Sequence, residues 1–185
     1  MHAESDHPLP VVRVGEIPEE DTTQRWLVEQ LWGDSSVGVI GGAPKCSKTW
    51  LGLDLALSVA TGTACLGTYA VPRAGPVLVY LAEDALTVVR ERVQGMARHR
   101  GLDLDAVDIH VITAPTLRLD RDPHRTRLFE TAKRLRPRLL LLAIEGSSRD
   151  SLHDRVFMDC LSVEDNCELA ANQGDIHGLP VALLP

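Results

Sequence analysis

Residues 37–61 decide the fold, and they read VGVIGGAPKCSKTWLGLDLALSVAT. The first four form a short apolar run, which is typical of a buried strand. Residues 48–60 are apolar nearly all round, which predicts a helix that is covered on both sides. A loop containing glycine and lysine joins the two segments. We therefore expect a strand, a phosphate-binding loop and a helix in succession.

The loop follows the P-loop (Walker A) pattern G-x-x-x-x-G-K-[ST] at Gly42, Lys48 and Thr49. In such a loop, backbone N–H groups and the positive end of the helix dipole hold phosphate oxygens. The lysine can reach the β- and γ-phosphates, and the threonine hydroxyl can bind Mg²⁺. The residues expected to bind ATP or a close relative are Gly42, Ala43, Pro44, Lys45, Cys46, Ser47, Lys48 and Thr49. The alternative is a glycine-rich turn with a surface lysine.

Ser47 replaces the second glycine of the pattern. If the backbone there needs a positive φ, a serine costs on the order of 1 kcal/mol. If φ is already helical, the serine costs little and can cap the helix. The sequence is compatible with both conformations.

The rest of the chain alternates strand-like and helix-like segments. We predict strands at 76–81, 109–112, 139–144 and 180–184, helices at 84–100 and 122–136, and a short segment with helical spacing at 23–32. In the helix at 84–100, Asp84 is expected to cap the start and Leu86, Val89, Val93 and Met96 to share one face. Asp122 is expected to cap the next helix, which buries Leu128, Ala132 and Leu135. Such alternation is typical of a three-layer α/β/α fold with a mainly parallel sheet.

Composition points to an ordinary globular domain in residues 22–185, preceded by a loose lead-in at 1–21. There is no secretory pattern and no apolar run of the length that spans a membrane, so a cytoplasmic location without membrane contact is expected. The net charge of −7 argues against binding nucleic acid through bulk electrostatics. The four cysteines lack metal-ligand spacing, which favours free thiols over zinc.

Residues 24–142 resemble the RecA-type ATPases, and within them the RepA-like hexameric helicases and related AAA-type ATPase domains. The resemblance rests on residues 26–29, on the loop at 42–49 and on the segment 77–84. It implies a RecA-like P-loop NTPase fold that uses MgATP, with a homo-oligomeric ring as a possible assembly and DNA as a possible partner. These last two expectations are analogies with the family alone.

Glu83 follows the strand at 76–81 and precedes a helix. By resemblance, it orients and deprotonates the attacking water, beside the catalytic contribution of Lys48. A carboxylate at the carboxyl edge of a parallel strand lies where ligands bind in open α/β sheets. The alternative is that Glu83 only caps the following helix.

Two departures from the family bear on activity. Ala143 stands where the family has the aspartate that holds Mg²⁺ through water, and Glu145 lies two residues farther on. Glu145 would face the same side of the strand, about 6.6 Å away, and could partly replace the aspartate as a metal ligand. Residues 145–176 match the family poorly, so the fold is expected to be incomplete at the carboxyl end, either as a natural short variant or as a fragment or disturbed reading frame. The functional hypotheses are therefore an ATPase, a module that binds ATP without hydrolysing it, and an inactive fragment.

Many arginines lie in or beside the helices at 84–100 and 122–136. A helicase relative could use them on DNA, or one of them could act on the γ-phosphate of a neighbouring subunit. The acidic total favours a third interpretation, in which they form solvated helix faces.

Overall fold

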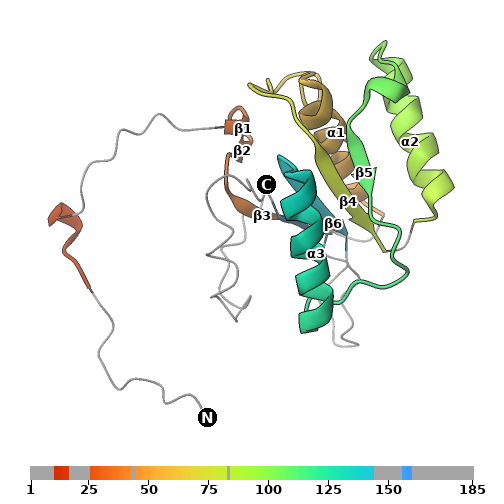
Figure 1. Ribbon diagram of the computed structural model, residues 1–185. Coiled ribbons are helices and arrows are strands. Elements are labelled where there is room, and N and C mark those ends of the chain that lie inside the picture. The colour runs from red at the N-terminus through yellow and green to blue at the C-terminus, as the bar shows by residue number, and fades with distance from the viewer. Residues whose placement is uncertain (1–10, 17–25, 43–44, 83, 144–155, 160–185) are drawn as a thin grey trace.

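The structure is a computed structural model that describes residues 11–16, 26–42, 45–82, 84–143 and 156–159. Figure 1 shows the arrangement of its elements. In chain order they are η1 (Val14–Glu16), β1 (Trp26–Val28), β2 (Trp32–Gly33), β3 (Val37–Ile40), α1 (Lys48–Thr61), β4 (Val77–Leu81), α2 (Leu86–His99), η2 (Leu104–Ala106), β5 (Ile109–Val111), α3 (Asp122–Leu135), β6 (Leu139–Ala143) and β7 (Val156–Asp159). No helix in these ranges is long and apolar enough to cross a membrane.

The main sheet has the strand order β3-β7-β6-β4-β5. Strand β4 pairs in parallel with β5 and with β6, whereas β7 runs antiparallel to both of its neighbours, β3 and β6. Strands β3, β4, β5 and β6 consequently share one direction, as the sequence predicts, and β7 is reversed. The sequence analysis did not predict β7.

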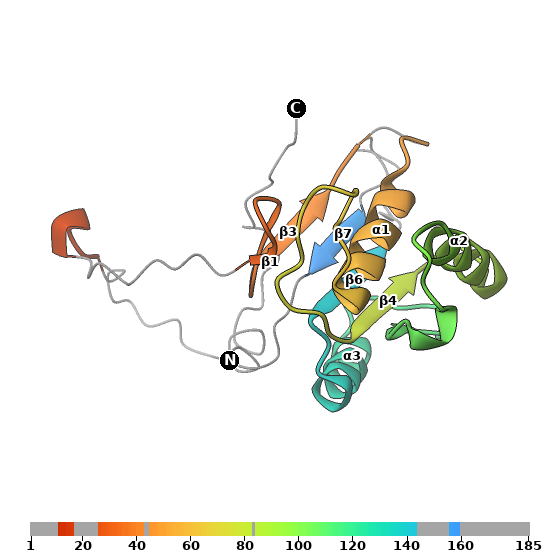
Figure 2. The ribbon, with the colours of Figure 1, turned by 90° about the horizontal axis from the view of Figure 1, so that it is seen from above.

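Helices α1 and α2 cover one face of the sheet and α3 covers the other, which Figure 2 shows from above. Alternation along β4 explains this arrangement. Val77, Val79 and Leu81 belong to the core shared with α1 and α2, whereas Leu78 and Tyr80 pack with Leu128 of α3. The structure is therefore a three-layer mixed α/β fold with parallel central strands, compatible with the expected RecA-like architecture.

Strands β4 and β6 are apolar on both faces because helices cover both faces of the sheet. Leu139, Leu140, Leu141 and Leu142 of β6 are each no more than 1% exposed. Burial of a leucine side chain contributes roughly 1.5–3 kcal/mol, so this strand is a major source of stability. The predicted buried strand at 37–40 is present, but β3 is only partly covered and Val37 is 40% exposed.

The helical spacing predicted for residues 23–32 is wrong where the structure describes it. Strands β1 and β2 form an antiparallel hairpin, and Gln30 in its turn has a φ of 60° that interrupts any helix. The Trp32 side chain packs the hairpin against β3. The contact is close, since a Cβ atom at Gly38 of β3 would lie 2.5 Å from the Trp32 ring. Gly38 therefore permits the close approach of Trp32.

The three main helices confirm the prediction in extent, and α2 and α3 differ from it in their first turns. Helix α1 ends at Gly62, whose φ of 73° favours glycine. Helix α2 begins at Leu86 with no side-chain cap, so the predicted capping by Asp84 is wrong. Leu86 is 50% exposed and does not belong to the buried face, which consists of Val89, Val93 and Ala97.

Helix α3 begins one residue earlier than its predicted capping pattern. Arg121 occupies the N-cap position without a side-chain cap, and Asp122 is the first helical residue. The helix buries Leu128 and Ala132, and Leu135 is partly buried. It ends before Pro137, as expected. The predicted strand at 180–184 lies outside the described residues.

A polar cluster joins α1 to the residue that follows α2. The guanidinium of Arg100 donates to the hydroxyls of Ser58 (2.9 Å) and Thr63 (2.7 Å) and forms an ion pair with Asp54. The other carboxylate oxygen of Asp54 accepts the backbone N–H of Leu66 at 2.8 Å. The ion pair is mostly covered, since the two charged side chains are 15% and 18% exposed. This cluster fixes the α1–α2 layer and the loop behind it.

Candidate nucleotide-binding site

The candidate loop connects β3 to α1, and α1 packs against β4 and β6 in one core. Its backbone has an unusual conformation at two non-glycine residues. Lys45 has a φ of 63° and Ser47 a φ of 67°, whereas Cys46 between them does not have a positive φ. Alternation in the sign of φ is a feature of anion-binding nests, in which successive N–H groups turn toward one point.

The conformation of Ser47 answers the question that the sequence left open. Ser47 is the N-cap residue of α1, it lies in the left-handed region, and its side chain makes no capping hydrogen bond. The second glycine of the pattern is thus replaced at a position where glycine is favoured. The loop keeps its shape at a local cost of about 1–2 kcal/mol.

Ser47→Gly is expected to raise the free energy of unfolding by about 0.5–1 kcal/mol. Glycine removes the left-handed strain, and the greater freedom of the unfolded chain offsets part of the gain. Urea titration measures the change. The matched control is Thr126→Gly on the exposed side of α3, which should lose about 0.5–1 kcal/mol because its backbone is helical. If both variants lost the same free energy of unfolding, the left-handed conformation at Ser47 would be contradicted.

Lys48, the first residue of α1, lies across the loop. Its side chain is only 9% exposed, and its ammonium donates to the carbonyl of Gly42 at 3.0 Å and lies 4.0 Å from the Sγ atom of Cys46. A Cβ atom at Gly42 would lie 2.6 Å from that sulfur, so Gly42 lets the Cys46 side chain lie close to the backbone. The structure thus brings Gly42, Cys46 and Lys48 together.

Thr49 follows Lys48 in the first turn of α1 and is half-buried. Ala43 and Pro44, which complete the predicted phosphate-binding set, lie outside the described residues.

Strands β4 and β6 end side by side at the same edge of the sheet. Leu81 pairs with Ala143, and the N–H of Ala82 donates to the carbonyl of Ala143 at 3.1 Å. The last residue of β6 is Ala143, at which the resemblance predicts a metal-site aspartate. The predicted carboxylates Glu83 and Glu145 lie outside the described residues.

The polar groups of the loop are better suited to binding phosphate than to binding a metal ion. Backbone N–H groups and the Lys48 ammonium are hydrogen-bond donors for anionic oxygens. Within the described ranges, no group of three or more His, Cys, Asp or Glu side chains could hold a metal ion. Of the two predicted Mg²⁺ ligands, Thr49 and Glu145, only Thr49 lies within the described residues. Few protein ligands are expected, because Mg²⁺ usually keeps several waters and binds through substrate phosphates.

A second polar group borders the loop, and the sequence analysis missed it. Arg92 of α2 forms an ion pair with Asp84 at 2.7 Å, and its guanidinium lies 5.5 Å from the ring centre of Trp50. Asp84 therefore ties the end of β4 to α2 instead of capping the helix. No spacing rule could have found this contact, because its three residues come from three separate segments.

The arginines predicted to form solvated helix faces are only partly solvated. Arg92, Arg100 and Arg138 are each 25% exposed or less and form ion pairs with Asp84, Asp54 and Asp34. The acidic composition thus supplies internal partners for several arginines. This corrects the solvated-face interpretation for these three residues.

A family model described as an AAA domain matches residues 3–143, which is more than half of the chain. Neither the curated proteins nor the solved structures gave a match. The matched range contains the loop, α1, and the strands β3 to β6. This chain belongs to the AAA domain family and is a nucleotide-binding domain of the P-loop ATPase type.

Proposed function

We propose that the protein binds MgATP and hydrolyses it, as an ATPase domain related to the RepA-like replicative helicases. The observation that carries this proposal is the loop from Gly42 to Lys48. Its alternating backbone, the start of α1 and the crossing lysine together provide donors for a polyphosphate. A surface turn would leave the lysine in solvent, whereas Lys48 is buried.

Each expected residue has a distinct task in the proposed reaction. The backbone N–H groups of residues 42–48, except Pro44, which has none, and the Lys48 ammonium hold the phosphates and stabilise the charge that develops on them. The Thr49 hydroxyl would help to hold Mg²⁺, and Glu145 would supply a carboxylate for it. Bound Mg²⁺ would neutralise phosphate charge. Glu83 positions the attacking water and accepts its proton.

The finer assignments belong to the same proposal. Residues 22–185 form one domain behind the lead-in at 1–21, and the domain works in the cytoplasm. A homo-oligomeric ring acting on DNA is proposed by analogy with the RepA-like helicases.

A second candidate function is a module that binds ATP without turnover. The observation that favours it is Ala143 at the end of β6, next to the end of β4. The loss of a metal-site carboxylate weakens the transition state more than the ground state, because charge develops during phosphoryl transfer. An inactive fragment is a third hypothesis, and a broad thermal melt that MgATP does not shift would favour it.

Glu83→Gln separates the first two functions. The substitution should abolish steady-state ATP hydrolysis, by about 100-fold or more, because it removes the proposed base. It should leave the dissociation constant for a fluorescent ATP analogue within about threefold, because the phosphate donors are unchanged. Glu91→Gln, at an exposed position on α2, is the control with full turnover. Saturable binding without turnover in the unmodified protein would instead establish the binding module.

Alkylation of Cys46 should report occupancy of the loop. Its thiol is exposed beside Lys48, so bound MgATP is expected to slow its reaction with iodoacetamide by about tenfold or more. Burial, with Asp54 nearby, raises the pKa of the Cys65 thiol to about 12, so this second described cysteine stays unreactive at pH 8. Mass spectrometry of a Cys160→Ser, Cys167→Ser background measures the rate at Cys46. An unchanged rate at saturating MgATP would contradict binding in this loop.

A further inference from the structure

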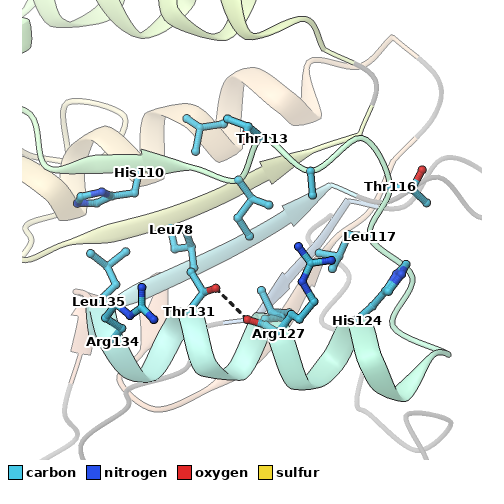
Figure 3. Close-up of a pocket in the computed structure, with 14 residues that line it drawn as sticks. Leu78, His110, Thr113, Thr116, Leu117, His124, Arg127, Thr131, Arg134 and Leu135 are labelled. Atoms are coloured by element: carbon cyan, nitrogen blue, oxygen red, sulfur yellow. Dashed lines mark hydrogen bonds between the residues drawn. The ribbon is translucent and has the colours of Figure 1, made fainter.

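A groove of about 520 Å³ runs between β5 and α3, on the face of the sheet that α3 covers. Figure 3 shows its two walls, one from α3 and one from β5 and the loop that follows. The lining includes both His124 and Leu135, so the groove follows α3 for about 16 Å. Its volume lies within the range of small-molecule sites, which is roughly 300–1,000 Å³. The shape therefore suits an elongated small molecule.

The floor of the groove is apolar. Leu78 of β4, Leu117 of the loop and Leu128 of α3 line it and belong to one buried cluster. The backbone of Leu117 is held in place, because its N–H donates to the hydroxyl of the buried Tyr80 at 3.0 Å. A hydrocarbon body that lies on this floor leaves water without burying an unpaired polar group. The floor is thus a preformed contact for the apolar part of a ligand.

The rim of the groove is rich in hydrogen-bond donors. Arg127 and Arg134 line it from α3, and neither has an ion-pair partner among the residues that the structure describes. At one end, the Nδ1 atom of His124 accepts the backbone N–H of Arg118 at 3.0 Å, which leaves the proton of the neutral ring on Nε2 as a further donor. None of the described residues that line the groove is acidic. The rim therefore favours anionic oxygens.

Two acidic residues next to the lining residues are already paired. Asp108 bonds to the ring of His110 at 2.7 Å, and Glu130 of α3 forms an ion pair with Lys133 at 3.6 Å. The two rim arginines consequently keep their positive charge at the groove, in a chain whose net charge is −7.

We propose that the groove binds an elongated organic dianion, with a carboxylate at each end of a hydrocarbon body. Arg127 and Arg134 lie about 10 Å apart along the helix axis. Between them, the Thr131 hydroxyl donates to the carbonyl of Arg127 at 2.8 Å (Figure 3), so its proton is not offered to a ligand. Two cationic ends separated by an apolar middle match a ligand with two charged ends.

Each part of the ligand has a distinct contact. One carboxylate meets Arg127 and the Nε2–H donor of His124, and the other carboxylate meets Arg134. A guanidinium can bind a carboxylate through two parallel hydrogen bonds, which also orients the ligand. The hydrocarbon body covers the leucine floor. Strand β5 and strand β3, which leads into the phosphate loop, are at opposite ends of the sheet, about 19 Å apart, so this inference does not depend on nucleotide binding.

An NMR titration of the full chain with sebacate, a linear aliphatic dicarboxylate, tests the proposal. Sebacate should shift the amide signals of residues that line the groove, such as Leu117 and Thr131, and leave those of α2 unchanged. Its Kd should be on the order of 1 mM, from the usual affinity per atom of small ligands. Decanoate, which has the same chain length and one carboxylate, should bind about fivefold more weakly. The uncharged decanediol should cause no measurable shift.

Two single variants and their combination identify the groups that bind the carboxylates. Arg127→Gln and Arg134→Gln should each weaken sebacate binding by about fivefold, and the double variant by about 25-fold, because sites this far apart act independently. Both positions are exposed, so the variants should fold, which thermal melts verify. Arg90→Gln, at an exposed position on α2, is the control that should bind sebacate with an unchanged Kd.

Three outcomes would overturn the proposal. The first is a sebacate titration that leaves the signals of the groove residues unshifted. The second is a double variant that folds and binds sebacate with the Kd of the unmodified protein. The third is decanoate binding as tightly as sebacate, which would show that the groove does not hold two carboxylates.

Discussion

Lys48→Ala is expected to weaken the binding of MgATP by about 10- to 150-fold. A hydrogen bond to a charged group contributes about 1.5–3 kcal/mol, and the Lys48 ammonium is the charged donor that the loop encloses. Titration with a fluorescent ATP analogue measures the loss.

Lys45→Ala is the matched control in the same loop. Lys45 also carries an ammonium, but its side chain is exposed, and its contribution comes from the backbone conformation at a φ of 63°. Loss of the Lys45 ammonium should change the affinity for MgATP by less than about threefold, as expected for an exposed charge. Thermal melts of both variants show whether the loop variants still fold. Equal affinities in Lys48→Ala and the unmodified protein would remove the basis of the proposed function.

Arg100→Met is expected to lower the free energy of unfolding by about 2–3 kcal/mol. Removing one partner of a buried ion pair costs about 3–5 kcal/mol, and the 15–18% exposure of this pair reduces the cost. The loss of bonds to Ser58 and Thr63 adds to it. For a chain of this size, the melting temperature should fall by roughly 5–10 °C in differential scanning calorimetry.

Two further variants distinguish the ion pair from a general effect of arginine removal. Arg98→Met changes an exposed side chain in the last turn of α2 and should alter the melting temperature by less than about 2 °C. Adding Asp54→Ala to Arg100→Met should cost less than the sum of the two single changes, because the unpaired carboxylate is removed. Additive losses would show that the two residues act independently.

Periodicity predicted the parts of the fold in which burial decides the structure. The apolar runs at 76–81 and 139–144 appear as β4 and β6, since helices on both faces require continuous apolar residues. The apolar surface of α1 predicted its burial for the same reason. The phosphate loop was visible because its chemistry restricts residue types at fixed spacing. Its carboxylates, Glu83 and Glu145, remain predictions.

Contacts between distant segments were not predictable. The hairpin at 26–33 depends on Trp32 meeting Gly38, which overrides the local helical spacing. Asp84 was expected to cap a helix because its position suits that role, but the ion pair with Arg92 is available only after α2 has packed beside β4. Strand β7 is four residues long and carries no turn signal that identifies it. The backbone conformation of Ser47 was not predictable either, since serine is compatible with both a left-handed and a helical φ at this position.

The reversed strand β7 determines when the nucleotide loop can form during synthesis. Strand β3 reaches β6 only through β7, and Ile40 pairs with Val156. A ribosome must therefore translate as far as Asp159 before the strand that leads into the loop acquires the neighbour that the described residues give it, although β4, β5 and β6 can already associate. Ligand capture by a nascent chain should accordingly appear only after β7 has left the ribosome.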